Sequence, residues 1–133
     1  MQRPCKTSDL NRKVYMKFSE SLKKNKDFQF VYRNGRSCGN RLLVLYVYPA
    51  GNGRNRLGIS VSKKVGNSVV RHHLARLIRE SYRLHEEEFV DGLDMIVIAR
   101  QSAKESSFFE IERALLHLAR KQSALKNAQG SSS

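Results

Sequence analysis

The side chains best suited to chemistry recur along one segment, residues 67–85, which has the apolar periodicity of a helix. At ~100° per residue, the basic residues opposite the apolar positions form one narrow stripe. These residues are His72, Arg76, Arg79 and Arg83, with Arg71 at the edge of the stripe near the helix start. A planar guanidinium group offers paired donors to phosphate oxygens and can stack on bases. The stripe therefore predicts contact with a nucleic-acid backbone, and structured RNA is the partner that we favour.

An ordinary solvated helix face is the alternative. Such faces normally mix charges of both signs, because neighbouring turns then form pairs. Between residues 67 and 79 the segment contains three arginines and no acidic residue, which argues against this alternative. Lys63 and Lys64 come just before the expected helix, and Asn67 is suited to cap it. Because free N–H groups and the helix dipole attract phosphate, these three residues extend the predicted RNA-binding site.

The charge of the whole chain also points to a polyanionic partner. Its 133 residues include 25 Lys and Arg against 12 Asp and Glu, a formal net charge of +13. Phosphate neutralisation with release of counterions favours binding by such a surface. A hydrophobic content of 40% suffices for one packed domain rather than a disordered basic tail. A membrane surface is a weaker alternative, since no stretch spans a bilayer and no amphipathic helix joins a bulky aromatic edge to a lysine face.

The two ends of the chain lack the patterning of the middle. We expect residues 1–20 to form a flexible basic arm, residues 21–126 the domain, and residues 127–133 a disordered tail. The N-terminus has no apolar segment of a secretory signal, and Met16 is an alternative start. The two cysteines fit no zinc-ligand or redox spacing, so we expect reduced thiols in a cytoplasmic protein.

Between the ends, hydrophobic periodicity predicts a single α+β domain of order αββαβα, with helices packed on one small sheet. The expected elements are a helix from Asn25 that ends at a left-handed Gly35, strands at 41–48 and 56–62, a helix from Asn67 to about His85, a strand at 95–99 and a helix after Ser107. Ser107 and Glu110 have the spacing of a capping box. The central helix is expected to bury Val70, Leu74, Leu77, Ile78 and Leu84.

Several other functions fit the sequence less well. His72 and His73 diverge by ~100° on a helix, so they cannot converge on one metal ion as the site of a protein nuclease. The glycine at 58 and the lysines that follow lack the second glycine of a P-loop. A helix-turn-helix DNA reader is disfavoured because the arginine-bearing helix follows a strand. A ribosomal or other structural RNA-binding protein stays the main alternative, because composition does not distinguish it.

The run RLGISVSKKVGNSVVRHHLARLIRE, residues 56–80, resembles the signature of the bacterial ribonuclease P protein subunit, whose pattern reads approximately SxSKKxGNAVxRNRxKRxxRE. The resemblance extends from about Leu22 to Lys121 and implies an αβββαβα sandwich with an additional short strand near 37–40. It also implies a left-handed βαβ crossover around the central helix, of the type found in the second domain of ribosomal protein S5. Such a crossover is an exception to the right-handed rule.

The resemblance implies a role in an endonuclease of the bacterial cytoplasm that removes 5′ leaders from precursor tRNA. In that family a large RNA is the catalyst and binds the Mg²⁺, so the protein would supply neither a catalytic residue nor a metal site. Its partners would be this RNA and precursor tRNA, not DNA or a membrane. By position, the motif residues that match the family are Lys63, Lys64, Asn67, Arg71, Arg76 and Arg79.

Three aromatic residues match a cleft in which the family holds the single-stranded leader; they are Phe28, Tyr32 and Tyr46. Rings in such a cleft stack on unpaired bases, and core packing is the alternative for all three. The chain departs from the family pattern at His72-His73, which replaces Asn-Arg, and at Ala75, which replaces lysine. Two formal charges are lost, partly recoverable if the histidines protonate against phosphates. Three cations outside the motif could compensate; they are Arg12, Lys13 and Arg83.

Overall fold

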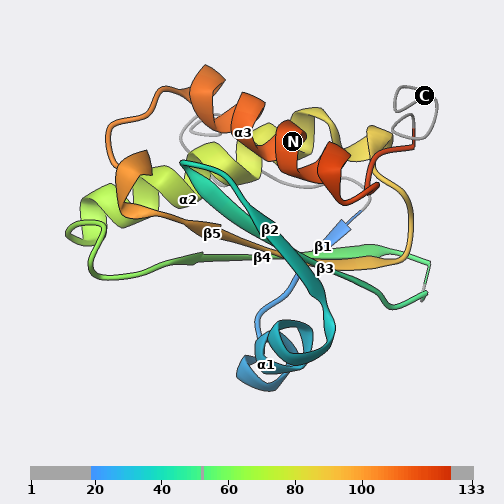
Figure 1. Ribbon diagram of the computed structural model, residues 1–133. Helices are drawn as coiled ribbons and strands as arrows, with labels where there is room; N and C mark the ends of the chain where they lie inside the picture. The colour runs from blue at the N-terminus through green and yellow to red at the C-terminus, as the bar shows by residue number, and fades with distance from the viewer. Residues whose placement is uncertain (1–18, 52, 127–133) are drawn as a thin grey trace, which may run out of the picture.

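Five strands form one mixed sheet with helices on both faces in the computed structural model, which describes residues 19–51 and 53–126 (Figure 1). The elements are β1 (Ser19–Ser21), α1 (Asn25–Asn34), β2 (Arg36–Gly39), β3 (Leu43–Pro49), β4 (Asn55–Val61), α2 (Ser68–Leu84), β5 (Leu93–Ala99) and α3 (Phe108–Lys121). Two short 3-10 helices, η2 (Glu86–Glu88) and η3 (Gln101–Ala103), flank β5. The strand order is β1-β4-β5-β3-β2, and the fold is the expected α+β sandwich.

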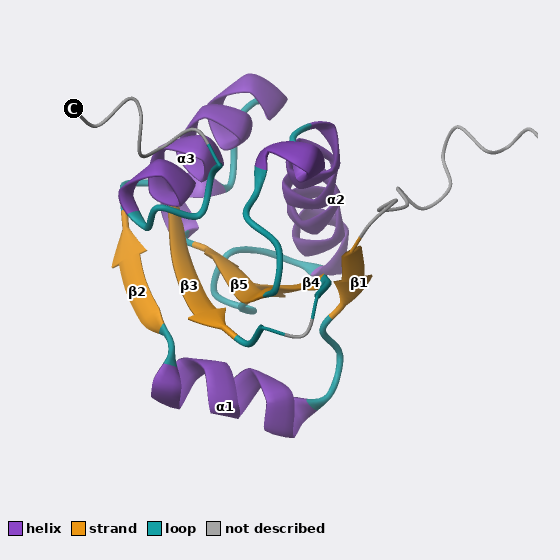
Figure 2. Cartoon of the chain, turned by 90° about the vertical axis from the view of Figure 1, so that its right-hand side faces the viewer, coloured by secondary structure: helices purple, strands orange, loops and turns teal. Residues whose placement is uncertain are grey.

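Helices α2 and α3 cover one face of the sheet, and α1 crosses the other (Figure 2). β4 and β5 are parallel neighbours joined through α2. In Figure 1 both strands run from right to left while α2 returns above them, and in Figure 2 β5 lies to the left of β4. Together these directions make the β4-α2-β5 connection left-handed. The structure thus has the rare crossover that the resemblance implied.

The alternation of β3 divides its side chains between two apolar clusters. Leu43, Leu45 and Val47 face α2 and α3 and are buried in the main core. Tyr46 and Tyr48 face the opposite way, toward a small cluster under α1.

The expected strands and helices lie in the sequence as predicted, with ends shifted by one or two residues. The short strand that the resemblance implied near residue 37 is β2.

Both predicted helix caps are present. The side chain of Asn67 accepts a hydrogen bond from the backbone N–H of Val70 (3.0 Å) and begins α2. Ser107 and Glu110 form the reciprocal pair of a capping box at the start of α3. These local signals fix where the two helices on the main core begin.

Gly35 ends α1 as predicted, but the left-handed conformation assigned to it was wrong. Its φ of −83° and ψ of 165° are extended. A Cβ atom at this position would lie 2.8 Å from the carbonyl oxygen of Val31 and 3.0 Å from that of Val47. A glycine stands here because the turn from α1 into β2 passes against two backbone carbonyls, not because the backbone requires a positive φ.

Leu84 was expected on the buried face of α2, and this was also wrong, since 50% of the residue is exposed. The last buried positions of the helix are Ser81 and Tyr82. The Tyr82 ring packs against Phe89 with centroids 4.9 Å apart, and its hydroxyl lies 2.6 Å from the Ser19 hydroxyl. The end of α2 is therefore anchored by an aromatic residue with a hydrogen-bonding tip rather than by leucine.

Strand β1 is absent from the predicted elements. It pairs in parallel with β4, with Ser19 opposite Asn55 and Ser21 opposite Leu57. The two residues at 19 and 20, which the prediction assigned to the arm, are thus part of the sheet. The rest of the arm, with Arg12, Lys13 and Met16, and the tail at 127–133 lie outside the described residues.

Candidate RNA-binding site

The basic stripe of α2 projects away from the sheet. The helix buries Leu74 and Ile78 completely, so the residues on the opposite side of each turn point to solvent. His72 is exposed, and Arg76, Arg79 and Arg83 are half-buried along their stems. The structure therefore presents these four predicted side chains on one face of the helix, opposite its buried residues.

Arg71 takes a different position from the rest of the motif. It is half-buried, and its Nε donates a hydrogen bond to the carbonyl oxygen of Gly66 (3.2 Å). This contact holds the guanidinium beside the first turn of α2, near Lys63 and Lys64. Arg71 thus adds charge to the amino-terminal end of the helix, where the dipole also favours an anion.

Buried and hydrogen-bonded neighbours hold the backbone of the turn before α2, whereas the two lysines of this turn are exposed. Val65 is only 3% exposed, and its N–H donates to the carbonyl oxygen of Ser62 (3.1 Å). The side chain of Gln101 donates to the carbonyl oxygen of Lys64 (3.1 Å). Lys63 and Lys64 therefore extend from a held backbone, which reduces the conformational entropy lost when they bind phosphate.

Arg100 joins this end of the site, although the sequence analysis did not select it. It directly follows β5, and β4 ends in the turn that carries Lys64. Because the two strands are parallel, their carboxyl ends meet at one edge of the sheet. Lys64 and Arg100 line a hollow of about 460 Å³ there, together with Ser62 and Ser102. A basic residue immediately after a buried parallel strand is the sequence signal that could have identified Arg100.

The three predicted aromatic residues come together on the other face of the sheet. The rings of Phe28 and Tyr32 have centroids 6.2 Å apart, and those of Tyr32 and Tyr46 are 5.0 Å apart, both edge-to-face. We call these three residues the aromatic cluster. Phe28 lies over Gly58, where a Cβ atom would come within 2.6 Å of its ring. Residue 58 must therefore be glycine for α1 to sit this close to β4.

The aromatic cluster is only partly buried. Tyr32 keeps 37% of its surface exposed, whereas Phe28 and Tyr46 are half-buried against the cluster under α1. Burial raises the pKa of the Tyr32 hydroxyl, and a hydrogen bond with Ser60 only partly offsets this effect. The phenol is therefore protonated at neutral pH. The cluster combines ring surface with hydroxyl groups, the combination that unpaired bases bind.

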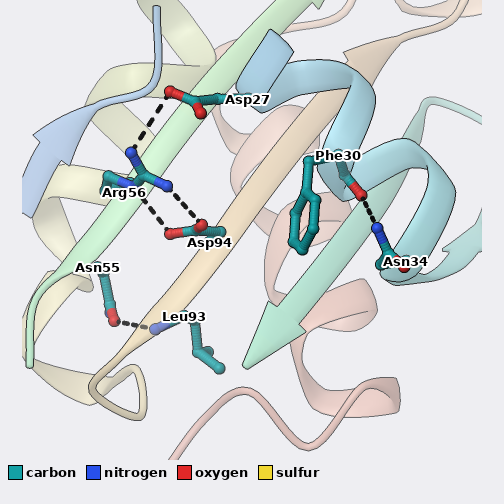
Figure 3. Close-up of polar contacts among 7 residues, drawn as sticks. All are labelled: Asp27, Phe30, Asn34, Asn55, Arg56, Leu93 and Asp94. Carbon is teal, nitrogen blue, oxygen red and sulfur yellow. Dashed lines mark hydrogen bonds and ion pairs between the residues drawn. The ribbon is translucent and has the colours of Figure 1, made fainter. Parts of the chain in front are cut away.

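An ion-pair network attaches α1 to the sheet beside this cluster (Figure 3). Arg56 of β4 forms a bidentate pair with Asp94 of β5, with Nε–Oδ1 and Nη2–Oδ2 distances of 3.0 and 2.7 Å. Its Nη1 lies 3.5 Å from an Asp27 carboxylate oxygen on α1. The Asp94 carboxylate raises the pKa of the Arg56 guanidinium, mainly through the hydrogen bonds. One side chain thus connects α1, β4 and β5.

Comparison with known proteins identifies the family. A family model described as Ribonuclease P matches residues 16–123. The chain belongs to the ribonuclease P protein family. The ribonuclease P protein component of Lachnoclostridium phytofermentans is 50% identical over 111 residues, covering 84% of this chain and 96% of that protein. The component of Alkaliphilus metalliredigens is 52% identical over 106 residues, covering 80% and 96%.

The fold agrees with this membership. The structure of the Staphylococcus aureus ribonuclease P protein superposes with a TM-score of 0.75 at 39% identity, covering 81% of this chain and 99% of that one. Family membership displaces the ribosomal alternative that composition had left open. As a member of the ribonuclease P protein family, the chain takes part in an endoribonuclease holoenzyme and has an RNA partner.

No group of three or more His, Cys, Asp or Glu side chains in residues 19–51 and 53–126 could hold a metal ion. No helix within those ranges is both long and apolar enough to cross a membrane.

Proposed function

We propose that α2 binds the catalytic RNA of ribonuclease P and that the aromatic cluster holds the single-stranded 5′ leader of precursor tRNA. The observation that supports this division most strongly is that α2 and α1 lie on opposite faces of the sheet (Figure 2). A protein that used one face for a folded RNA would keep the other available for a second RNA segment. Lys63, Lys64 and Arg100 lie at the sheet edge, where they can contact phosphates of either RNA.

The chemistry of the two surfaces matches these two ligands. Arg76 and Arg79 offer forks of N–H donors to phosphate oxygens of a folded RNA without reading its bases. His72 adds a donor in either protonation state, because neutral imidazole retains one N–H. Tyr32 and Tyr46 instead present ring surface, on which a base can stack only if it is unpaired.

In this proposal the RNA performs phosphodiester hydrolysis with its own Mg²⁺. The described residues offer no acidic or histidine cluster that fits a metal ion, and we assign no catalytic step to the protein. Its contribution is to strengthen binding of the substrate, through the leader, and to neutralise phosphates where two RNAs meet. We place this activity in the bacterial cytoplasm, where tRNA precursors are made.

The test compares the protein with and without a ribonuclease P RNA. Purified protein alone should leave precursor tRNA intact, and the protein combined with the RNA should release the 5′ leader at the mature end. Robust Mg²⁺-dependent cleavage by RNA-free protein at the same bond, with contaminating RNA excluded, would contradict the proposed division of labour.

A further inference from the structure

A second aromatic pair lies on the flank of α1 opposite the aromatic cluster. The Phe30 ring packs edge-to-face on Tyr48, with centroids 5.0 Å apart, and Phe30 is 47% exposed. Tyr48 is directly opposite Asp94 in the sheet, and Asp94 is opposite Arg56, so the pair lies in the same row as the Arg56 network. Figure 3 shows Phe30 beside this network. The contact with Tyr48 therefore holds Phe30 at a fixed position while about half of the residue faces solvent.

The exposed side of α1 connects this pair to the aromatic cluster. At ~100° per residue, the residues that follow Tyr32 around the helix span roughly 160°; in angular order they are Asn25, Gln29, Arg33, Lys26 and Phe30. All five are exposed. The exposed surface of α1 between the aromatic cluster and Phe30 is therefore formed by polar and basic side chains, with an aromatic ring at each end. We call this surface the outer path.

The outer path carries positive charge with little to cancel it. α1 contains Lys26 and Arg33, and Lys24 is its N-cap, whereas Asp27 is the one acidic residue in the helix sequence. Asp27 is turned toward the sheet and paired with Arg56. Exposed cations interleaved with an aromatic ring are the pattern of surfaces that bind single-stranded nucleic acid.

We propose that the outer path is a second binding segment for single-stranded RNA, occupied by the part of a long leader that extends beyond the aromatic cluster. Lys26 and Arg33 contact phosphates as the strand crosses the helix, and one base stacks on the exposed face of Phe30. This inference rests on the proposed function, because the strand must first occupy the aromatic cluster. The charge of the path favours RNA over a protein segment, and a protein ligand is an outcome that the test below separates.

The experiment measures the affinity of the reconstituted holoenzyme for precursor tRNAs whose leaders are lengthened one nucleotide at a time. Phe30→Leu retains apolar cover over Tyr48 but removes the ring face. It should bind short-leader substrates like the parent and lose about tenfold in affinity once the leader is long enough to reach residue 30, as expected for one stacked base. Thermal unfolding of the free variant checks that it folds.

A second variant tests the phosphate contacts independently. Lys26→Gln combined with Arg33→Gln should make the salt dependence of binding shallower for long leaders only. Lys104→Gln removes an exposed cation between β5 and α3, outside the path, and should leave the difference between long and short leaders unchanged. Equal salt slopes for parent and double variant at every leader length would overturn the proposal.

Tyr46→Ala separates failure of this inference from failure of the proposed function. It should weaken binding of short and long leaders alike. If Tyr46→Ala has no effect at any leader length, the aromatic cluster does not bind the leader and both proposals are wrong. If Tyr46→Ala weakens binding while Phe30→Leu matches the parent at every length, or weakens all lengths equally, only the outer path is refuted, and Phe30 is left as a protein contact or as packing over Tyr48.

Discussion

The Arg56–Asp94 pair allows a quantitative prediction about the stability of the network that connects β4, β5 and α1. The Asp94 side chain is only 3% exposed and accepts two hydrogen bonds from Arg56, whose own side chain is 29% exposed. Arg56→Met keeps most of the apolar stem but removes the charge, which leaves a buried carboxylate without its partner. Breaking a buried pair in this way costs about 3–5 kcal/mol.

We expect a loss near the lower end, about 3 kcal/mol, because the Arg56 side chain retains contact with water. A loss of this size lowers the melting temperature of a domain of this length by roughly 10 °C and is a large part of a typical unfolding free energy of about 5–15 kcal/mol. Urea unfolding followed by circular dichroism measures it. The double variant Arg56→Met/Asp94→Leu should recover most of the loss, since no charge is then left buried.

The matched control is Arg54→Ala. Arg54 contacts Glu20 at 3.3 Å, but both side chains are more than half exposed. A solvent-exposed pair contributes below about 1 kcal/mol, so this variant should unfold almost as the parent does. If Arg56→Met loses no more stability than Arg54→Ala, the idea that the network stabilises the fold must be abandoned.

Three further predictions concern the two RNA surfaces and the end of α2. Replacing both Arg76 and Arg79 with alanine should weaken binding to the catalytic RNA while the protein stays folded. It should also reduce the slope of log affinity against log salt concentration by about two. Unchanged affinity and slope would mean that the stripe is an ordinary solvated helix face that does not contact the RNA. Tyr46→Ala should cost roughly 1–3 kcal/mol in affinity for precursor tRNA but nothing for mature tRNA, and an equal loss for both would mean a packing role. Burial lowers the pKa of His85, but hydrogen bonds to Glu112 and Glu88 outweigh this effect, so the pKa is raised in the folded protein. Its stabilisation should be complete below the unfolded value of about 6.5 and lost as pH rises through the folded value. In urea unfolding at about pH 6, the unfolding free energy of His85→Gln should therefore be lower than that of the parent by up to about 1 kcal/mol. The difference should become small at alkaline pH. A difference that grows with pH would contradict a raised pKa of His85 in the folded protein.

The elements that sequence reasoning placed correctly depend on short-range rules. The helix cap at Asn67 and the capping box at Ser107 need only a few neighbouring residues, and the alternation of β3 repeats over seven. The stripe of α2 follows from helical periodicity alone, which is why its four outward side chains lie where they were expected. The aromatic cluster, by contrast, was assembled from the family resemblance, because nothing local relates residue 46 to residues 28 and 32.

The features that sequence reasoning missed depend on contacts between distant segments. β1 is three residues of sequence SES without alternation, and only its pairing with β4 makes it a strand. Arg56 reads as an ordinary charged residue until the fold brings it to Asp27 and Asp94, 29 residues before it and 38 after it. Gly35 was recognised as a helix stop. Glycine is required there because two backbone carbonyls lie close to it, and the one on β3, that of Val47, belongs to a distant segment that local sequence does not reveal.

The most direct test of the central claim is cleavage of precursor tRNA by a bacterial ribonuclease P RNA at a low Mg²⁺ concentration, measured with and without this protein. We predict that the RNA alone releases little leader under these conditions, and that the protein restores cleavage at the mature 5′ end. Cleavage that does not change when the protein is added, although the protein is folded and bound to the RNA, would contradict the account.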